Sequence, residues 1–296
     1  MLKYFLLLFC MSAISFAGPK ILIVTAHPDD ESACAASVFK LTHDLAAKVD
    51  ILLVTNGEGG YKYSVLAEDL YDLPLTKELV GREYLPSIRK KELMAGGKYI
   101  GIRNYYFLDQ KDTEYTLNPD SVLNIVWDTS LVLKRIQQVH SKNNYDYVFV
   151  LLPTESTHGH HKAATILALQ AIRNMSQNMR PVIVGFSVVD SISINPEPFK
   201  GLSSYPLTSI ASGLPIAGFN RNQKFGFNNR LDYSIIVNWL IAEHKSQGAM
   251  QLGVGKGDIE YWWNFDINGS ESTKKIQALV DTMNATPYKI RVHNEQ

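Results

Sequence analysis

The stretch Ala26-His27-Pro28-Asp29-Asp30-Glu31 lies between two segments with different patterns of apolar residues. Residues 20–25, before it, are apolar and β-branched, which is typical of a buried strand. Residues 32–41, after it, are small or apolar and favour a helix. The six residues are therefore predicted to form a strand-to-helix turn. Pro28 suits the first helical position, and the acidic residues 29–31 suit the first helical turn.

This turn carries more chemistry than a helix start requires. Helix capping explains one or two of the acidic residues, but it does not explain a histidine three positions before Asp30. At this spacing His27 and Asp30 can face the same side of the turn, at the carboxyl end of a strand where α/β sheets bind ligands. An imidazole and a carboxylate are two of the three protein ligands of a typical catalytic zinc site.

A second group of histidines offers the third ligand. Residues 145–152 form another predicted buried strand, and His158, His160 and His161 follow it before a helix that runs to about residue 171. The chain has eight histidines, and three of them fall within these four positions. A solvated histidine-rich loop is the simpler alternative, but this clustering favours a metal site.

Together these motifs resemble the zinc-dependent N-deacetylases of the N-acetylglucosaminyl-phosphatidylinositol de-N-acetylase (PIG-L, LmbE-like) family. The resemblance implies a Rossmann-like fold and hydrolysis of an N-acetyl group on a glucosamine unit. Carried over by position, it makes His27, Asp30 and His161 the metal ligands. It makes Asp29 the general base, and it makes His158, as a cation, the residue that stabilises the oxyanion and the leaving group.

One position departs from the family pattern. His160 stands where many members carry an aspartate that orients a neighbouring histidine. A ligand histidine normally needs a partner for its second nitrogen, so another residue must supply it here. The departure also leaves His160 open as a ligand in place of His161, although only His161 keeps the three-residue spacing from His158.

The order of predicted elements defines the fold class. Strands alternate with helical segments and are expected at residues 20–25, 49–55, 105–108, 145–152 and 181–186. This alternation predicts an α/β, Rossmann-like three-layer fold with a mostly parallel sheet and helices on both faces. The two histidine motifs can meet only if the first and fourth strands are neighbours, at a switch in strand order.

The middle of the chain offers weaker candidates. A helix is expected to begin at Ser87, and its Arg89 and Glu92 match a family Arg-x-x-Glu pair; physically they predict an ion pair. Before it, residues 61–86 are expected to form a long connection with four tyrosines, suited either to sugar contacts or to a surface insertion. Asp109 and Asp112 follow the third strand, where acidic residues are usually solvated although they could face the pocket.

Four further segments complete the prediction for the chain. Residues 123–140 predict an amphipathic helix, and residues 233–247 predict another. The second contains His244, which starts a His-x-Ser-Gln sequence often seen in the family; its simplest role is to interact with the helix dipole. Between these helices, residues 190–230 are irregular. The aromatic residues 260–265 are expected to close an edge of the core.

The first residues predict a signal peptide. Residues 1–17 contain a short basic start, an apolar run and small residues at the cleavage positions, so we expect a secreted or periplasmic protein. The apolar run is short for a membrane span, and a signal anchor is the alternative. Residues 18–296 then form a single LmbE-like domain without a stable span, in which Cys34 is the one cysteine and is expected to pack in the core.

These features predict a function and exclude two classes. The charges balance, with 29 Lys+Arg and 29 Asp+Glu, which argues against a nucleic-acid-binding protein. The glycines at 57–60 lack a nucleotide-binding fingerprint. We expect a hydrolase that uses Zn²⁺, or another divalent transition metal, to deacetylate an N-acetylglucosamine-containing conjugate. The alternatives are a metal hydrolase of another amide or ester, and a non-catalytic glycan-binding protein, against which the non-ligand Asp29 argues.

Overall fold

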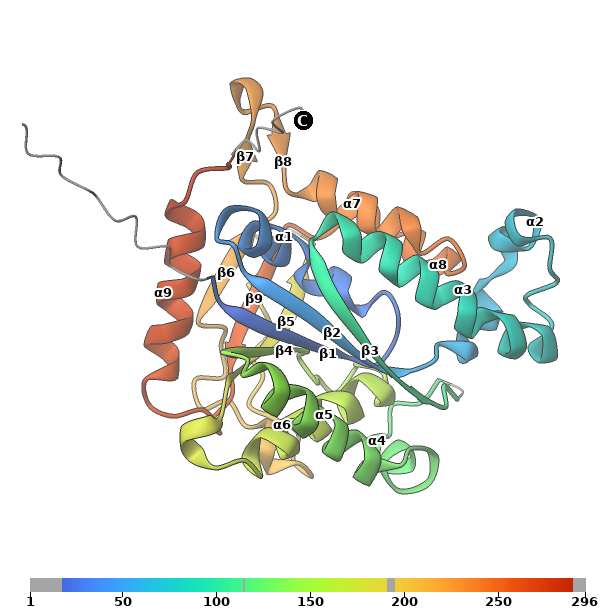
Figure 1. The fold of residues 1–296 in the computed structure, drawn as a ribbon, viewed down its shortest axis with the longest axis horizontal. Helices are drawn as coiled ribbons and strands as arrows, with labels where there is room; N and C mark the ends of the chain where they lie inside the picture. Colours follow the sequence, from blue (N-terminus) through green and yellow to red (C-terminus); the bar gives the residue numbers. More distant parts are fainter. Residues whose placement is uncertain (1–17, 114, 191–194, 290–296) are drawn as a thin grey trace, which may run out of the picture.

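A seven-stranded sheet forms the centre of the computed structural model, which describes residues 18–113, 115–190 and 195–289 (Figure 1). In spatial order its strands are β3 (Ile102–Gln110), β2 (Lys48–Thr55), β1 (Lys20–Thr25), β4 (Tyr147–Leu151), β5 (Val182–Val189), β9 (Ile259–Asn264) and β6 (Ala217–Asn220). The first five are mutually parallel, and β9 runs antiparallel to both β5 and β6. The expected mostly parallel sheet is confirmed.

Strand β1 is the point where the strand order reverses. Leu22 of β1 pairs with Asp50 of β2 on one side and with Val148 of β4 on the other. The turn after β1 and the loop after β4 therefore leave the same edge of the sheet side by side. This is the switch point that the two histidine motifs required.

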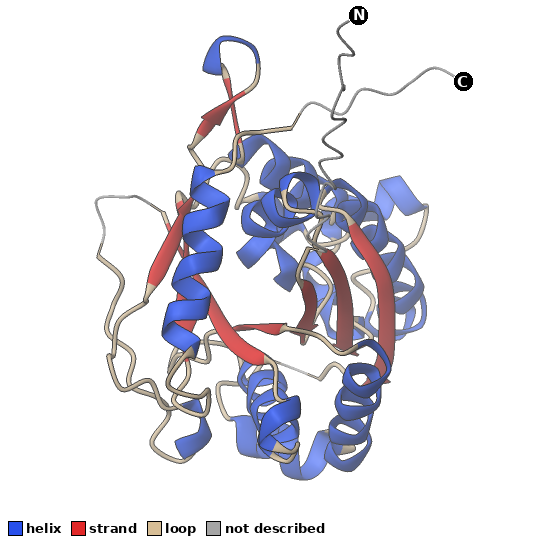
Figure 2. Ribbon diagram, turned by 60° about the vertical axis from the view of Figure 1, so that its left-hand side comes forward, coloured by secondary structure: helices blue, strands red, loops and turns tan. Residues whose placement is uncertain are grey.

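Helices cover both faces of the sheet, as Figure 2 shows. One face packs against α1 (Ala35–Asp44), α3 (Glu78–Tyr99), α7 (Ser234–Glu243) and α9 (Ser272–Ala285). The other packs against α5 (Thr129–Asn143) and α6 (Gly159–Arg173). Alternate residues of β1 enter the two cores: Ile21 and Ile23 one, Leu22 and Val24 the other. The three-layer architecture is therefore built into the strand sequence.

Short elements complete the fold. They are the 3₁₀ helices η1 (Asp30–Cys34), η2 (Glu58–Tyr63), η3 (Val65–Ala67), η5 (Gln177–Met179), η6 (Pro206–Thr208) and η7 (Phe227–Asn229), the π turn η4 (Val122–Val126), the single-turn helices α2 (Glu68–Tyr71), α4 (Pro119–Ser121) and α8 (Gly248–Gln251), and the hairpin of β7 (Lys224–Phe225) with β8 (Leu231–Asp232). Across the described ranges, none of the helices has the length and apolar character needed to cross a bilayer. The predicted signal peptide lies outside the described residues.

The turn after β1 differs from the expected helix start. Pro28 is not the first helical residue, because η1 begins at Asp30 and the α-helix only at Ala35. Oδ2 of Asp30 accepts hydrogen bonds from the backbone N–H groups of Ala26 and His27, both at 2.9 Å, and so folds the chain back on itself. Asp29, which lies between His27 and Asp30 in the chain, has a φ of 115°, which is uncommon for a residue other than glycine.

The expected start of the third helix at Ser87 is wrong. Helix α3 begins at Glu78 and carries Pro86 in its interior, so the connection after η2 is shorter than expected. Buried packing explains this outcome: Gly81 and Leu85, which precede the proline, are both buried. Tertiary packing of a helix face outweighs the loss of one N–H donor.

Other boundaries also shift. The predicted helix at 123–140 begins only at Thr129, where Asp128 caps it by accepting a hydrogen bond from the N–H of Leu131. The predicted helix at 233–247 ends at Glu243. The aromatic segment is not an edge, because β9 lies inside the sheet with Trp262 in one core and Trp263 in the other.

Candidate active site

Three predicted ligands meet at the switch point. Nδ1 of His27 lies 2.9 Å from Nε2 of His161, which lies 3.0 Å from Oδ1 of Asp30. His27 Nδ1 and Asp30 Oδ1 are 3.9 Å apart. Ligand atoms on a tetrahedral zinc ion, at bonds of about 2.0–2.1 Å, would be separated by about 3.4 Å, so the observed distances bracket this value. Two imidazoles and one carboxylate form a group that is able to hold a metal ion and that fits zinc.

The carboxylate of this group is ionised. Burial alone would raise the pKa of Asp30, but His161 and His27 hold it far below its usual range. Its Oδ2 is occupied by two backbone N–H groups, so Oδ1 is the oxygen that faces the histidines. The turn therefore orients the carboxylate before any metal arrives.

The second nitrogen of His27, Nε2, faces both Nδ1 of His160, at 3.1 Å, and the carboxylate of Asp112. Oδ1 of Asp112 lies 3.4 Å from Nε2 of His27 and 3.2 Å from Nδ1 of His160. Burial opposes ionisation of Asp112, but His27, His160 and Arg89 hold its pKa well below the usual range. A solvated side chain was the expectation for Asp112, and it is wrong. The feature of the sequence that could have indicated this contact is the position of Asp112 just after β3, at the same sheet edge as His27.

His160 lies behind the cavity. It is fully buried, and its Nε2 is 3.1 Å from the hydroxyl of Thr113. With His27 and His158 it forms a second group that could hold a metal ion. However, that group contains no carboxylate, and His160 does not line the cavity that His27, His158 and His161 share. An ion that a substrate must reach is therefore better placed at His161.

The cavity beside these residues has a volume of about 480 Å³. Its walls come from the turn after β1, η2, α3, the loop after β3, the loop before α6, and α8. Tyr61, Tyr63 and Tyr115 line it, with Tyr63 and Tyr115 half exposed or more. Of the tyrosines predicted for a sugar site or a surface insertion, Tyr71 and Tyr84 do not line it.

The cationic form expected of His158 is not favoured. His158 caps α6, and its Nδ1 accepts the backbone N–H of His160 at 3.0 Å. Burial and the surrounding imidazoles lower the pKa of His158 to about 3. The ring is therefore neutral at neutral pH, and because Nδ1 accepts a hydrogen bond, its proton is on Nε2. His158 can donate a hydrogen bond, but it does not carry the expected charge.

Asp29 lines the cavity next to the ligand group without belonging to it. Its Oδ2 accepts a hydrogen bond from Nη2 of Arg89 at 3.1 Å, and Oδ1 has no hydrogen-bond partner among the described residues. Burial raises the pKa of Asp29, although Arg89 opposes the shift. A carboxylate with a raised pKa and a free oxygen is suited to accept a proton.

Arg89 binds the backbone of two turns at the site instead of pairing with a residue of its own helix. It donates to the carbonyl oxygens of Pro28 and Gly57, both at 2.7 Å, as well as to Asp29. The ion pair expected between Arg89 and Glu92 does not form; Glu92 lies on the same helix but is bound by other residues. Arg89 therefore joins the turns after β1 and β2.

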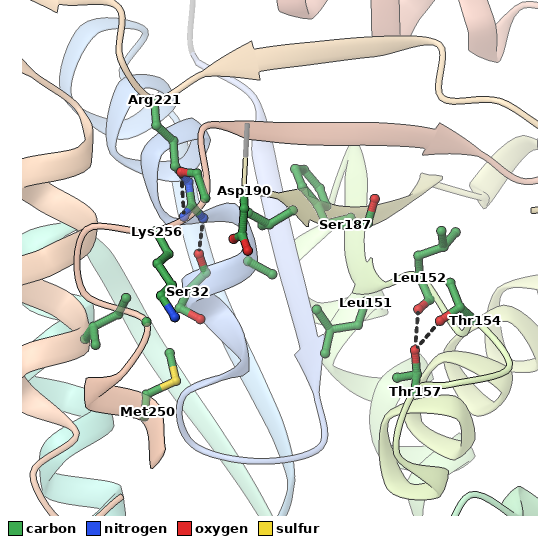
Figure 3. Close-up of a pocket in the computed structure, with 16 residues that line it drawn as sticks. Ser32, Leu151, Leu152, Thr154, Thr157, Ser187, Asp190, Arg221, Met250 and Lys256 are labelled. Atoms are coloured by element: carbon green, nitrogen blue, oxygen red, sulfur yellow. Dashed lines mark hydrogen bonds between the residues drawn. The ribbon is translucent and has the colours of Figure 1, made fainter. Parts of the chain in front are cut away.

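A second cavity, of about 410 Å³, lies at the carboxyl ends of β4 and β5 (Figure 3). Met250 lines both cavities. Arg221, which Figure 3 shows beside Ser32, donates to the Ser32 carbonyl oxygen at 2.6 Å and pairs with buried Glu260 at 2.9 Å. Within the part of the chain that the structure describes, no histidine lines this cavity. Arg221 thus binds the backbone of η1 directly.

A three-layer α/β fold with two histidines and an aspartate at its switch point is typical of metal-dependent hydrolases. The chain belongs to the GlcNAc-PI de-N-acetylase (PIG-L) family, whose model matches residues 22–172. The family predicted from the sequence motifs is therefore confirmed, and the protein is a member of a deacetylase family.

Curated relatives agree with this family, and a solved structure shares the fold. The "Probable N-acetyl-alpha-D-glucosaminyl L-malate deacetylase 2" of Bacillus cereus is 25% identical over 163 residues, which cover 55% of this chain and 65% of that protein. The protein of the same name from Bacillus anthracis is 25% identical over 61% of this chain and 72% of its own length. A deacetylase of the teicoplanin biosynthesis pathway, 16% identical, shares the fold with a TM-score of 0.50 over 84% of this chain and 100% of that chain.

Proposed function

We propose that the protein is a metal-dependent N-deacetylase that hydrolyses the acetamide of an N-acetylglucosamine-containing conjugate. The observation that carries the proposal is the ligand group His27, Asp30 and His161, whose two histidines line the same cavity as the non-ligand Asp29. The family and the names of the curated relatives support an acetamido sugar as the substrate. The aligned part spans only 65% of the first relative, so the substrate is part of the proposal.

The ligand group would hold a metal ion that acts as the Lewis acid. A zinc ion held there would lower the pKa of a water molecule to about 7 and would polarise the acetamide carbonyl. Asp30 contributes negative charge through Oδ1, while Asp112 keeps His27 oriented. At this step the protein itself contributes metal-ligand atoms that are fixed in position and partly shielded from water.

Asp29 carries the proton steps, and His158 stabilises the negative charge that develops. The free Oδ1 of Asp29 accepts a proton from the attacking water. The Nε2–H of His158 donates a hydrogen bond to the oxygen on which negative charge develops, as a neutral donor. Asp29, now protonated, returns its proton to the amine as the C–N bond breaks, so the products are acetate and a free glucosamine.

The first experiment measures acetate release from a panel of N-acetylglucosamine conjugates. The purified protein is assayed as prepared, after removal of metal by a chelator, and after zinc is added back. We expect the chelator to abolish release and zinc to restore it. Release that persists without metal would refute metal dependence. If only other amides or esters are cleaved, the sugar substrate is wrong and the metal hydrolase stands.

Two neighbouring carboxylates give a matched pair of variants. Asp29→Asn should keep one zinc per chain and lose at least about 100-fold in kcat, the range of general-base catalysis. Asp30→Asn should instead lose zinc, because it removes a charged ligand. Full activity in Asp29→Asn would exclude Asp29 as the base. Equal zinc content in both variants would exclude Asp30 as a ligand.

We also propose that the protein acts outside the cytosol. The support is the signal-peptide pattern of residues 1–17. Fractionation of cells that express the full chain, followed by N-terminal sequencing, should find a protein that begins at Gly18 outside the cytosol. A cytosolic protein that retains Met1 would refute the export proposal.

A further inference from the structure

Glu31 and His244 form a buried pair directly behind the candidate base. Both side chains are 0% exposed, and Nε2 of His244 lies 2.6 Å from Oε1 of Glu31. Nδ1 of His244 is buried and has no hydrogen-bond partner among the described residues. The one side-chain hydrogen bond of this histidine is therefore directed at Glu31.

The second oxygen of Glu31 holds the backbone of Asp29. Oε2 accepts the N–H of Asp29 at 2.9 Å. The φ of 115° at Asp29 lies in a region that few residues other than glycine occupy, and such a conformation persists only where its surroundings impose it. The bond from Glu31 is the one that fixes the N–H of Asp29, so it acts directly on this backbone angle.

His244 is itself anchored to the walls of the site. It follows the last residue of α7, and two positions later Ser246 donates its N–H and its hydroxyl to the carboxylate of Glu92 on α3, at 2.7 and 2.6 Å. Gln247 then donates to the carbonyl oxygen of Gly60 in η2 at 3.4 Å. The segment 244–247 thus joins α3, η2 and the turn after β1.

The raised pKa of His244 favours a charged hydrogen bond between the two residues. Burial alone would lower the pKa of His244, but Glu31, Asp29 and Glu92 raise it above its ordinary value. A hydrogen bond between an imidazolium and a carboxylate is stronger and more directional than one between neutral groups.

We propose that His244 and Glu31 are positioning residues that hold Asp29 in its left-handed backbone conformation and so fix its carboxylate at the cavity. Neither residue lines the cavity, so neither touches substrate. The inference rests on the proposed function in one respect, namely that Asp29 is the base. It predicts that a substitution in the pair lowers turnover only through its effect on Asp29.

Steady-state kinetics test this transmission. His244→Phe keeps a ring but removes the donor; it should lower kcat by about 10- to 100-fold, the cost of a displaced catalytic group, with KM and zinc content unchanged. His244→Gln retains an N–H donor and should recover most of the loss. A purely structural histidine would lose KM, zinc and kcat together, and glutamine would not rescue it.

A double-mutant cycle separates positioning from general damage. In an Asp29→Asn background, His244→Phe should cause no further loss of the residual kcat. Ser246→Ala is the matched control, since it weakens the same segment without touching Glu31; its effect should be small and equal in both backgrounds. A loss from His244→Phe that is equally large in both backgrounds would overturn the proposal.

Amide hydrogen exchange tests, without any substrate, whether the pair of Glu31 and His244 holds the backbone of Asp29. The Asp29 amide should exchange at least about 10-fold faster in His244→Phe than in the wild type, because its acceptor is released. If His244→Phe does not fold, Glu31→Asp replaces it, since the shorter side chain cannot span His244 and the Asp29 N–H. Unchanged exchange would overturn the proposal. A wild type that deacetylates no conjugate would refute the proposed function instead, and the exchange result would stand.

Discussion

Asp112→Asn should weaken zinc binding although Asp112 is not a ligand in the proposed site. Its Oδ1 lies 3.4 Å from the second nitrogen of the ligand His27 and 3.2 Å from His160. The carboxylate holds the His27 ring in the orientation that presents Nδ1 to Asp30 and His161. An asparagine keeps the size of the side chain, but it removes the charge and can present an N–H in place of the acceptor oxygen.

The expected magnitude follows from these contacts. A hydrogen bond to a charged group contributes about 1.5–3 kcal/mol, and loss of a residue that orients a metal ligand typically costs about 10- to 100-fold in affinity. We therefore expect a loss of about 2 kcal/mol, which corresponds to a zinc Kd about 30-fold weaker than that of the wild type.

The assay is competition for zinc against a chromogenic chelator at fixed pH and salt. Asp109→Asn is the matched control, because Asp109 lies three residues before Asp112, near the end of β3, its side chain is 54% exposed, and it pairs with Lys90. The control should keep the wild-type Kd. Thermal unfolding of both metal-free variants separates loss of affinity from loss of fold, since Asp112 also accepts the N–H of Gly59. A Kd for Asp112→Asn within threefold of the wild type would refute the reasoning.

Two further predictions concern stability. Gly81→Ala should lower the free energy of unfolding in urea by about 1–3 kcal/mol, because its Cβ would overlap Cβ of Tyr61, whereas Gly269→Ala, with open space around it, should not. Burial lowers the pKa of His140 below its ordinary value of 6.5, so the unfolded chain takes up the proton more readily and stability falls as the pH drops below about 6.5. His140→Gln, which keeps a donor for the Met179 carbonyl oxygen, should lose less Tm between pH 7.5 and 5.5; an identical loss would contradict this assignment.

The fold could be predicted because its central strands β1 and β4 are mostly apolar. In β1 and β4 the buried residues form continuous runs. Such runs are typical of a sheet that is covered on both faces. Helix boundaries were harder, because they depend on packing that the sequence does not display. Pro86 argued for a helix start, but buried Leu85 and Gly81 extend the helix backward past it.

The candidate site was predicted where chemistry and position coincide in a short stretch. His27, Asp30 and His161 each follow a strand at one sheet edge, and the structure brings them together. Asp112 was missed because an acidic residue in a polar loop is normally solvated. His244 was missed because its partner, Glu31, is 213 positions away in the chain. Such a pairing comes from the tertiary fold and leaves no local pattern.

The place of β9 in the sheet sets the order in which the chain can complete itself. Strand β5 ends at Val189, but its neighbour β9 begins only at Ile259. During synthesis the parallel strands can therefore assemble while β5 still presents an open and largely apolar edge. An open edge of this kind recruits other chains, so a protein truncated or stalled before residue 259 would be prone to aggregate. The C-terminal strand β9 thus protects the edge of β5 from pairing with other chains.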